Sequence, residues 1–219
     1  MGLVLYGHPF ASYVWKVLIA LYANETPFSF RLVDHDDPVS WQELERLWPM
    51  KRFPVLVDGD RVVIEAAIII EYCDLHYPGA RPLLPSDPDE ALDARFMGRF
   101  FDNYVATPQG AIVFDALRDE KDRSAKTVLD ARATLDTAYA WLDRRMRNRE
   151  WAAGDHFGFA DCAGAPDLFY ADWTHPIPAR FTALKSYRAR LLAHPSVARV
   201  VDEARPYRAL FPLGAPDRD

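Results

Sequence analysis

The stretch from Lys51 to Tyr72, with the sequence KRFPVLVDGDRVVIEAAIIIEY, limits more than any other how this chain can fold. Two short runs rich in β-forming residues flank Asp58-Gly59, a dipeptide typical of tight hairpin turns. Ile69 and the apolar residues that follow it have the i, i+3, i+4 spacing of a helix. We therefore predict a β-hairpin that leads directly into a helix beginning near Ala66.

The residues before this stretch predict a strand, a helix and a second strand close together. Leu3–Tyr6 is a short apolar strand, and Ser12 is a good N-cap for a helix over Tyr13–Tyr22. The alternating apolar residues of Thr26–Val33 indicate the second strand. Strands connected in this way are expected to pair in parallel through a right-handed crossover.

A short helix is predicted next, because Ser40-x-x-Glu43 is a capping box and Pro49 stops a helix. The order over residues 1–77 is then strand, helix, strand, short helix, two strands and helix. This order is the thioredoxin-like α/β arrangement, and we assign residues 1–77 to such a domain.

The chain changes character after residue 77. A run of prolines marks a linker, which we place at residues 78–88, and Asp87-Pro88 is a typical helix start. Beyond it we predict only helices, so that residues 89–219 form an all-α C-terminal domain. The first of them is expected to be interrupted near Pro108, with Met97, Phe100, Phe101 and Tyr104 as its apolar stripe, and others cover residues 124–146, 161–173, 183–192 and 195–204.

Composition argues against several classes of function. The net charge is −6 and the 26 lysines and arginines are scattered, so no basic surface for nucleic acid is expected. Cys73 and Cys162 lie in apolar helical settings typical of reduced thiols, and no Cys/His cluster has metal-binding spacing. No signal peptide or membrane-spanning run is visible. We expect a cytoplasmic protein with no metal, no nucleic acid and no membrane partner.

Three motifs, in order, resemble a known family. Lys51-Arg52-Phe53-Pro54-Val55-Leu56 and then Glu65-Ala66 are similar to the "Gly-Lys-Val-Pro-x-Leu" and "Glu-Ser" motifs of the cytosolic glutathione S-transferases. Gly158-Phe159-Ala160-Asp161 is similar to the "Ser/Thr-x-Ala-Asp" helix cap of the same family. On their order the chain is identified as a member of this family, similar to its bacterial serine-type members.

The resemblance implies a site for glutathione as co-substrate. The main chain of Phe53, beside a cis Pro54, would pair with the cysteinyl backbone of glutathione. Glu65 and Ala66 would take its γ-glutamyl end, and Arg52 would lie near its carboxylates. The residues alone leave two points open, because an X-Pro bond is cis in only about 5–6% of cases and a lone arginine is commonly a solvated charge.

The activity that the resemblance implies is conjugation of glutathione to a small apolar electrophile, as in detoxification, by a homodimer. Two other functions stay open. Ala11 and Ala66 each lack a hydroxyl that the family pattern uses, which would suit a non-catalytic binding protein with the same fold. A glutathione-dependent peroxidase or isomerase is the other alternative.

Catalysis would need a group that stabilises the thiolate of glutathione, because the thiolate is the nucleophile. Ser12 offers a hydroxyl at the positive end of a helix. In the serine-type pattern "Leu-Tyr-x-x-Pro-x-Ser-Pro-Tyr" the serine falls on Ala11, so a backbone N–H at the same helix end is an alternative. Tyr6 aligns with the catalytic tyrosine of other classes and is the second candidate. The structural alternatives are a helix cap for Ser12 and a packing role for Tyr6.

An apolar pocket for the electrophile is predicted between the two domains. Its wall would consist of Phe10, Phe101, Tyr104 and Phe114. The alternative is that these aromatic residues belong to the core, because a stripe at helical spacing is commonly a packing face.

Overall fold

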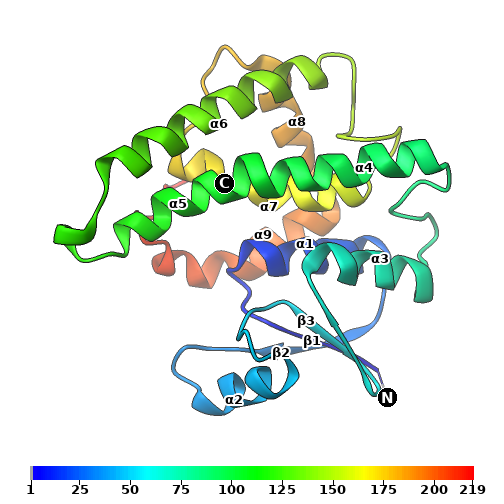
Figure 1. The fold of residues 1–219 in the computed structure, drawn as a ribbon. Helices are drawn as coiled ribbons and strands as arrows, with labels where there is room; N and C mark the ends of the chain where they lie inside the picture. Colours follow the sequence, from blue (N-terminus) through cyan, green and yellow to red (C-terminus); the bar gives the residue numbers. More distant parts are fainter. Residues whose placement is uncertain (1) are drawn as a thin grey trace.

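The computed structural model describes residues 2–219, and a four-stranded sheet forms the lower part of Figure 1. Its strands are β1 Leu3–Gly7, β2 Phe28–Leu32, β3 Val55–Asp58 and β4 Arg61–Ile64, in the order β2-β1-β3-β4. β1 pairs in parallel with β2 and antiparallel with β3, which pairs antiparallel with β4. The predicted thioredoxin-like arrangement and its parallel pair are confirmed.

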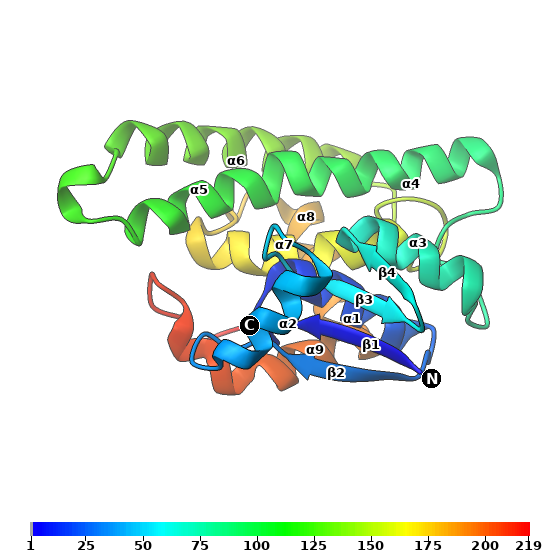
Figure 2. The same ribbon diagram turned by 60° about the horizontal axis from the view of Figure 1, so that its bottom comes forward.

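Three helices belong to the sheet domain: α1 Ser12–Ala23, α2 Pro38–Leu47 and α3 Ala66–His76. Figure 2 shows α2 in front of the sheet and α1 behind it. α1 also packs against two helices of the C-terminal half, α7 Phe159–Thr174 and α9 Pro195–Ala204. Buried side chains from both halves therefore form one continuous hydrophobic core.

The C-terminal half is helical, as predicted. The segment 77–87 contains no helix or strand, and we propose it as the linker between the domains. The helices are α4 Pro88–Phe101, the π-helical turn Asp102–Ala106, α5 Thr107–Ala116, α6 Ala125–Met146, α7 Phe159–Thr174, α8 Thr182–Ala193 and α9 Pro195–Ala204, with short 3₁₀ turns at Glu120–Asp122 and Arg205–Leu210.

Two predicted helix starts are wrong by a few residues. Ala11, rather than Ser12, is the N-cap of α1, since its backbone is extended and its carbonyl accepts from the third and fourth N–H groups of the helix start. The cap of α2 is Asp37, whose side chain accepts from the N–H of Val39. Pro38 occupies the first position of α2. The helix therefore begins at the pair Asp37-Pro38, before the predicted cap at Ser40.

The hairpin is confirmed, with its turn one residue later than Asp58-Gly59. Asp58 pairs with Arg61, so Gly59 and Asp60 form the turn, and Gly59 has the positive φ of 59° that glycine adopts readily. The helix after the hairpin begins at Ala66 as predicted.

The interruption predicted near Pro108 is found between α4 and α5, in the turn before that proline. Pro108 has no N–H to donate to the carbonyl of Tyr104, and the turn before it is π-helical, with Thr107 N–H bonded to the Asp102 carbonyl. The π turn shifts the helical register. Tyr104 is consequently 51% exposed rather than part of the buried stripe, whereas Met97 and Phe101 are buried as predicted.

Candidate functional site

A cavity of about 300 Å³ lies where the hairpin and the start of α3 meet the end of α4. All five predicted glutathione contacts line it: Arg52, Phe53, Pro54, Glu65 and Ala66. Its remaining wall includes residues from α1 and from the helical domain, namely Tyr13, Arg99, Asp102 and Asn103. The structure thus joins the two motifs of the sheet domain to residues that the sequence analysis did not assign to the site.

The segment that leads into β3 lines this cavity with Arg52, Phe53 and Pro54. The Phe53–Pro54 bond is cis, which confirms the isomer that the family resemblance implied. Pro54 is buried, and the half-buried ring of Phe53 packs on Trp41 of α2, with 6.0 Å between the ring centroids.

The start of α3 forms the opposite wall. Glu65 is its N-cap and has a φ of 70°, a left-handed conformation that is uncommon for a glutamate and is found preferentially at functional sites. The first intrahelical bond runs from Ile69 N–H to the Glu65 carbonyl. The N–H groups of residues 66–68 therefore have no acceptor among the described residues. Free N–H groups at a helix start favour an anionic ligand group.

The start of α1 carries further free donors. Within residues 2–219, the N–H groups of Ser12 and Tyr13 have no acceptor, whereas that of Val14 bonds to the Ala11 carbonyl. The Tyr13 side chain, 39% exposed, lines the cavity. Sequence reasoning missed Tyr13, although the family pattern quoted above has a tyrosine at the same place.

Tyr6 is not among the residues that line this cavity. Successive residues of a strand point to opposite faces of the sheet. Leu5 accordingly faces the main core, whereas Tyr6 packs in the small cluster beneath α2 that contains Val33, Leu44 and Val55. Its surroundings in the structure are those of a packing residue.

A buried ion cluster links the cavity to both domains. Lys16 of α1 is 2% exposed, and its Nζ lies 2.6 Å from Asp102 Oδ1 and 2.7 Å from Asp167 Oδ2 of α7. The two carboxylates raise the pKa of Lys16 against the opposing effect of burial. Burial raises the pKa of Asp167 to about 6. Asp102 thus contacts the buried ammonium of Lys16 and also lines the cavity.

The four aromatic residues predicted to wall an electrophile pocket are not brought together. Phe101 is fully buried, and Phe114 is 66% exposed on α5. Tyr104 lines a separate apolar hollow beside α6, together with Trp141. Phe10 packs on Tyr170 of α7, with ring centroids 5.4 Å apart. The helical stripe indicated apolar residues correctly but not which of them share a surface.

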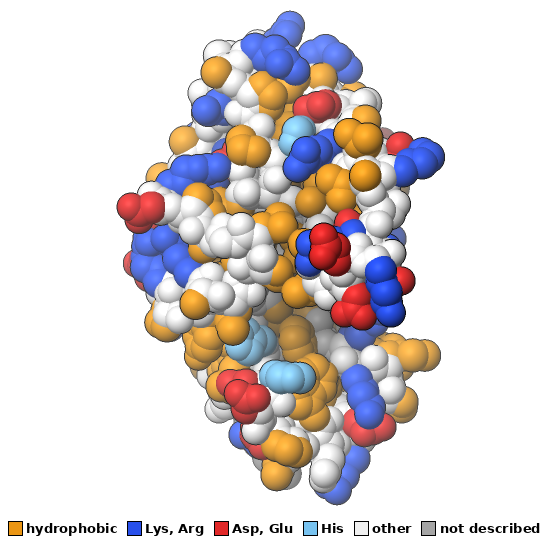
Figure 3. Space-filling model, turned by 90° about the vertical axis from the view of Figure 1, so that its left-hand side faces the viewer, with side chains coloured by type: hydrophobic (Ala, Val, Ile, Leu, Met, Phe, Trp, Pro, Cys, Tyr) orange, Lys and Arg blue, Asp and Glu red, His pale blue; other side chains and the backbone are white. Residues whose placement is uncertain are grey.

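The charges around the cavity are mixed. Arg52 and Arg99 supply cations, and Glu65 and Asp102 supply carboxylates. A small ligand with both carboxylates and an ammonium group would meet an opposite charge for each. In Figure 3 the surface is hollowed between the upper and lower halves of the molecule, with apolar and uncharged atoms in the hollow and histidine and charged side chains along parts of its rim.

Comparison with known proteins gives matches along most of the chain. Residues 5–81 match the family model "Glutathione S-transferase, N-terminal domain", and residues 105–195 match "Glutathione S-transferase, C-terminal domain". A probable glutathione S-transferase of Oryza sativa is 31% identical, over 70% of this chain and 69% of its own. A probable maleylacetoacetate isomerase of Vibrio cholerae is 27% identical, over 94% and 98%.

Solved structures agree with these matches. The crystal structure of a glutathione S-transferase from Methylobacterium radiotolerans, in complex with glutathione sulfonate, is 30% identical. Its TM-score is 0.79, and the match covers 91% of this chain and 94% of that one. Within residues 2–219 of the present structure, none of the helices is long and apolar enough to cross a membrane.

Proposed function

The chain belongs to the glutathione S-transferase family, and on that premise we propose that its cavity binds glutathione and presents the thiolate to a small apolar electrophile. One observation carries the proposal: the five residues that match the family's glutathione-binding motifs line a single cavity. Phe53 would pair with the cysteinyl backbone, Arg52 with a carboxylate, and Glu65 with the γ-glutamyl ammonium. The electrophile would enter beside the start of α1.

Two measurements test this proposal. Calorimetric titration with glutathione should show saturable binding, and chlorodinitrobenzene should be conjugated in a reaction that requires the protein and glutathione together. Binding without conjugation would favour the non-catalytic reading. If glutathione does not bind at millimolar concentration, the proposal fails.

A second candidate function is glutathione-dependent isomerisation. Its support is the relative named a probable maleylacetoacetate isomerase, which matches 94% of this chain. An assay of maleylacetoacetate with and without glutathione would distinguish the two. Turnover of maleylacetoacetate without conjugation of chlorodinitrobenzene would favour the isomerase.

The γ-glutamyl carboxylate would meet the free N–H groups at the start of α3, where this chain has Ala66 in place of the family's serine. Ala66→Ser adds one hydroxyl at the wall of the cavity. A hydrogen bond to a charged group contributes about 1.5–3 kcal/mol, and less where water competes. We expect calorimetry to show glutathione binding about tenfold tighter, with little change in thermal stability. Unchanged affinity would place the carboxylate elsewhere.

Thiolate stabilisation is assigned to the start of α1, with Ser12 as the residue that supplies it. The family pattern combines a serine at position 11 with a proline, which has no N–H, at position 12. This chain has lost the hydroxyl at Ala11 and has gained an N–H at Ser12, which has no acceptor among the described residues. We propose that this N–H, supported by the positive end of the helix, takes over the lost interaction.

Ser12→Pro removes the N–H and is compatible with the fold. Proline is favoured at the first helical position, and the extended backbone of Ala11 suits a following proline. We expect kcat/KM for conjugation to fall about tenfold or more, because a charge-assisted hydrogen bond is lost.

The control is Ser12→Ala, which removes only the hydroxyl and should lower kcat/KM by less than about threefold. Equal losses in both variants would assign the role to the hydroxyl, and no loss in either would exclude Ser12. A loss in Tyr6→Phe alone would restore Tyr6 as the donor.

We propose a homodimer in the cytoplasm. Exposed apolar side chains on α3 and α4, Ile68, Leu75, Leu92 and Phe96, support an interface between copies of this chain, since each is at least 46% exposed. The buried, unpaired Cys73 and Cys162 suit a reducing compartment. Light scattering should give twice the chain mass of 25.0 kDa, and a monomer at micromolar concentration would contradict this assembly.

A further inference from the structure

We propose that Tyr170 of the helical domain is a positioning residue for the thiolate, acting through the carbonyl oxygen of Phe10. The inference rests on the proposed function and adds to it an influence of the helical domain on the thiolate site. Tyr170 would not contact glutathione. It would fix the loop of residues 8–11, from which α1 and its free N–H groups begin.

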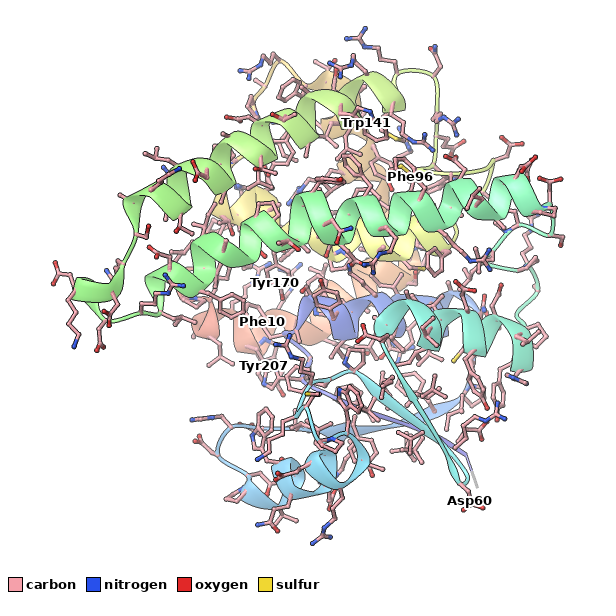
Figure 4. The ribbon with its side chains drawn as sticks, in the orientation of Figure 1. Phe10, Asp60, Phe96, Trp141, Tyr170 and Tyr207 are labelled. Atoms are coloured by element: carbon pink, nitrogen blue, oxygen red, sulfur yellow. The ribbon has the colours of Figure 1, made fainter. Side chains whose placement is uncertain are left out.

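The contact between Tyr170 and the loop is direct and shielded from water. The hydroxyl of Tyr170 donates to the Phe10 carbonyl at 2.8 Å, and the Tyr170 side chain is almost fully buried. The rings of the two residues meet edge to face at 5.4 Å. Figure 4 shows Phe10 and Tyr170 adjacent, next to the start of α1, with Tyr207 close by.

The other polar groups of the loop are held as well. The Pro9 carbonyl accepts from Trp15 Nε1 at 2.6 Å, and the N–H of Phe10 donates to His8 Nδ1 at 3.1 Å. The N–H of Ala11 donates to the His8 carbonyl at 3.0 Å. Both peptide groups between Pro9 and Ala11 are therefore bonded at their N–H and at their C=O, so neither can rotate freely.

The His8 ring has one protonation state that is compatible with these hydrogen bonds. Because Nδ1 accepts from Phe10, the ring must be neutral, with its proton on Nε2. Burial lowers the pKa of His8, against a smaller opposing effect of Asp34. The ring of Tyr207, from the 3₁₀ turn near the C-terminus, contacts His8 edge to face at 4.8 Å.

Bonding of the loop leaves the N–H groups of Ser12 and Tyr13 as the first free donors after it. Donors stabilise a developing or bound anion most when their direction is fixed beforehand. Four groups hold these two peptides: Trp15 Nε1, His8 Nδ1, the His8 carbonyl and the hydroxyl of Tyr170. Of these four, the Tyr170 hydroxyl alone comes from the helical domain. Its loss would leave the Phe10–Ala11 peptide bonded at its N–H alone, to the His8 carbonyl, and would loosen the direction of the donors beyond.

Tyr170→Phe removes this one hydroxyl and keeps the ring. The apparent pKa of the bound thiol should rise by about 0.5–1 unit. It is measured from the pH profile of kcat/KM for the electrophile at saturating glutathione and from thiolate absorbance. At a pH below that pKa, kcat/KM should fall about three- to tenfold, while the Kd for protonated glutathione changes less than about twofold.

Tyr139→Phe is the matched control. Tyr139 is fully buried in the helical domain, and its hydroxyl donates to another main-chain carbonyl, that of His175, at 2.9 Å. The two variants should lose similar stability, but only Tyr170→Phe should shift the thiol pKa. An unshifted pKa in Tyr170→Phe, or an equal shift in both, would overturn the inference. Glutathione binding and conjugation by the unmodified protein would still stand, so the proposed function is tested separately.

Discussion

Replacing Lys16 by methionine is expected to lower the free energy of unfolding by about 3–5 kcal/mol, the largest effect foreseen for a single substitution in this protein. Methionine fills a similar volume but leaves the carboxylates of Asp102 and Asp167 without their shared ammonium. Asp167 is 1% exposed, and its Oδ1 has no partner within residues 2–219, so water cannot compensate for the lost cation. Denaturant titration measures the change.

Two further variants make this test specific. Lys185→Met alters an exposed lysine of α8 and should change the free energy of unfolding by less than about 0.5 kcal/mol. Adding Asp102→Asn and Asp167→Asn to Lys16→Met removes the two negative charges that Lys16 neutralised and should recover most of the loss. A loss below about 1 kcal/mol for Lys16→Met alone would mean that the cluster does not stabilise the domain contact.

Replacing Glu65 by glutamine is expected to weaken glutathione binding about 10- to 100-fold, the largest effect foreseen on affinity. The change removes the charge that would face the γ-glutamyl ammonium and leaves the shape of the side chain. A charge-assisted hydrogen bond contributes about 1.5–3 kcal/mol, and each 1.4 kcal/mol changes Kd about tenfold. Calorimetry at fixed ionic strength gives the ratio of the two constants.

Asp60→Asn is the matched control, because it removes one negative charge, as Glu65→Gln does. Asp60 is exposed at the tip of the hairpin, away from the cavity (Figure 4), so its substitution should leave the Kd within about twofold. Asp102 also lines the cavity and could compensate in part for Glu65. Unaltered affinity in both Glu65→Gln and Glu65→Gln/Asp102→Asn would show that the ammonium lies elsewhere.

The sequence by itself determined the order and type of the main elements. Local signals suffice for this: the hairpin is specified by a turn dipeptide between two β-rich runs, and α4 by Asp87-Pro88. Where two local signals compete within a few residues, pattern alone chose wrongly, as at Ser40 against Asp37. At the start of α1 the structure places the cap one residue earlier than the pattern did, at Ala11.

The sequence also indicated one wall of the cavity. Arg52, Phe53, Pro54, Glu65 and Ala66 come from a single hairpin and the helix that follows, so their proximity is encoded by neighbouring segments. Their roles toward glutathione came from the family resemblance and are predictions still to be tested, as is membership of the serine-type subgroup.

Only the tertiary structure decided the rest of the site. Asp102 meets Lys16 across 86 positions of the chain, and Tyr170 meets Phe10 across 160. No periodicity specifies which face of a helix meets a distant loop, which is why the four aromatic residues assigned to one pocket do not share one. Packing between the domains chooses those partners, because burying an ammonium or a carbonyl is tolerable only where another element supplies the opposite charge or a donor.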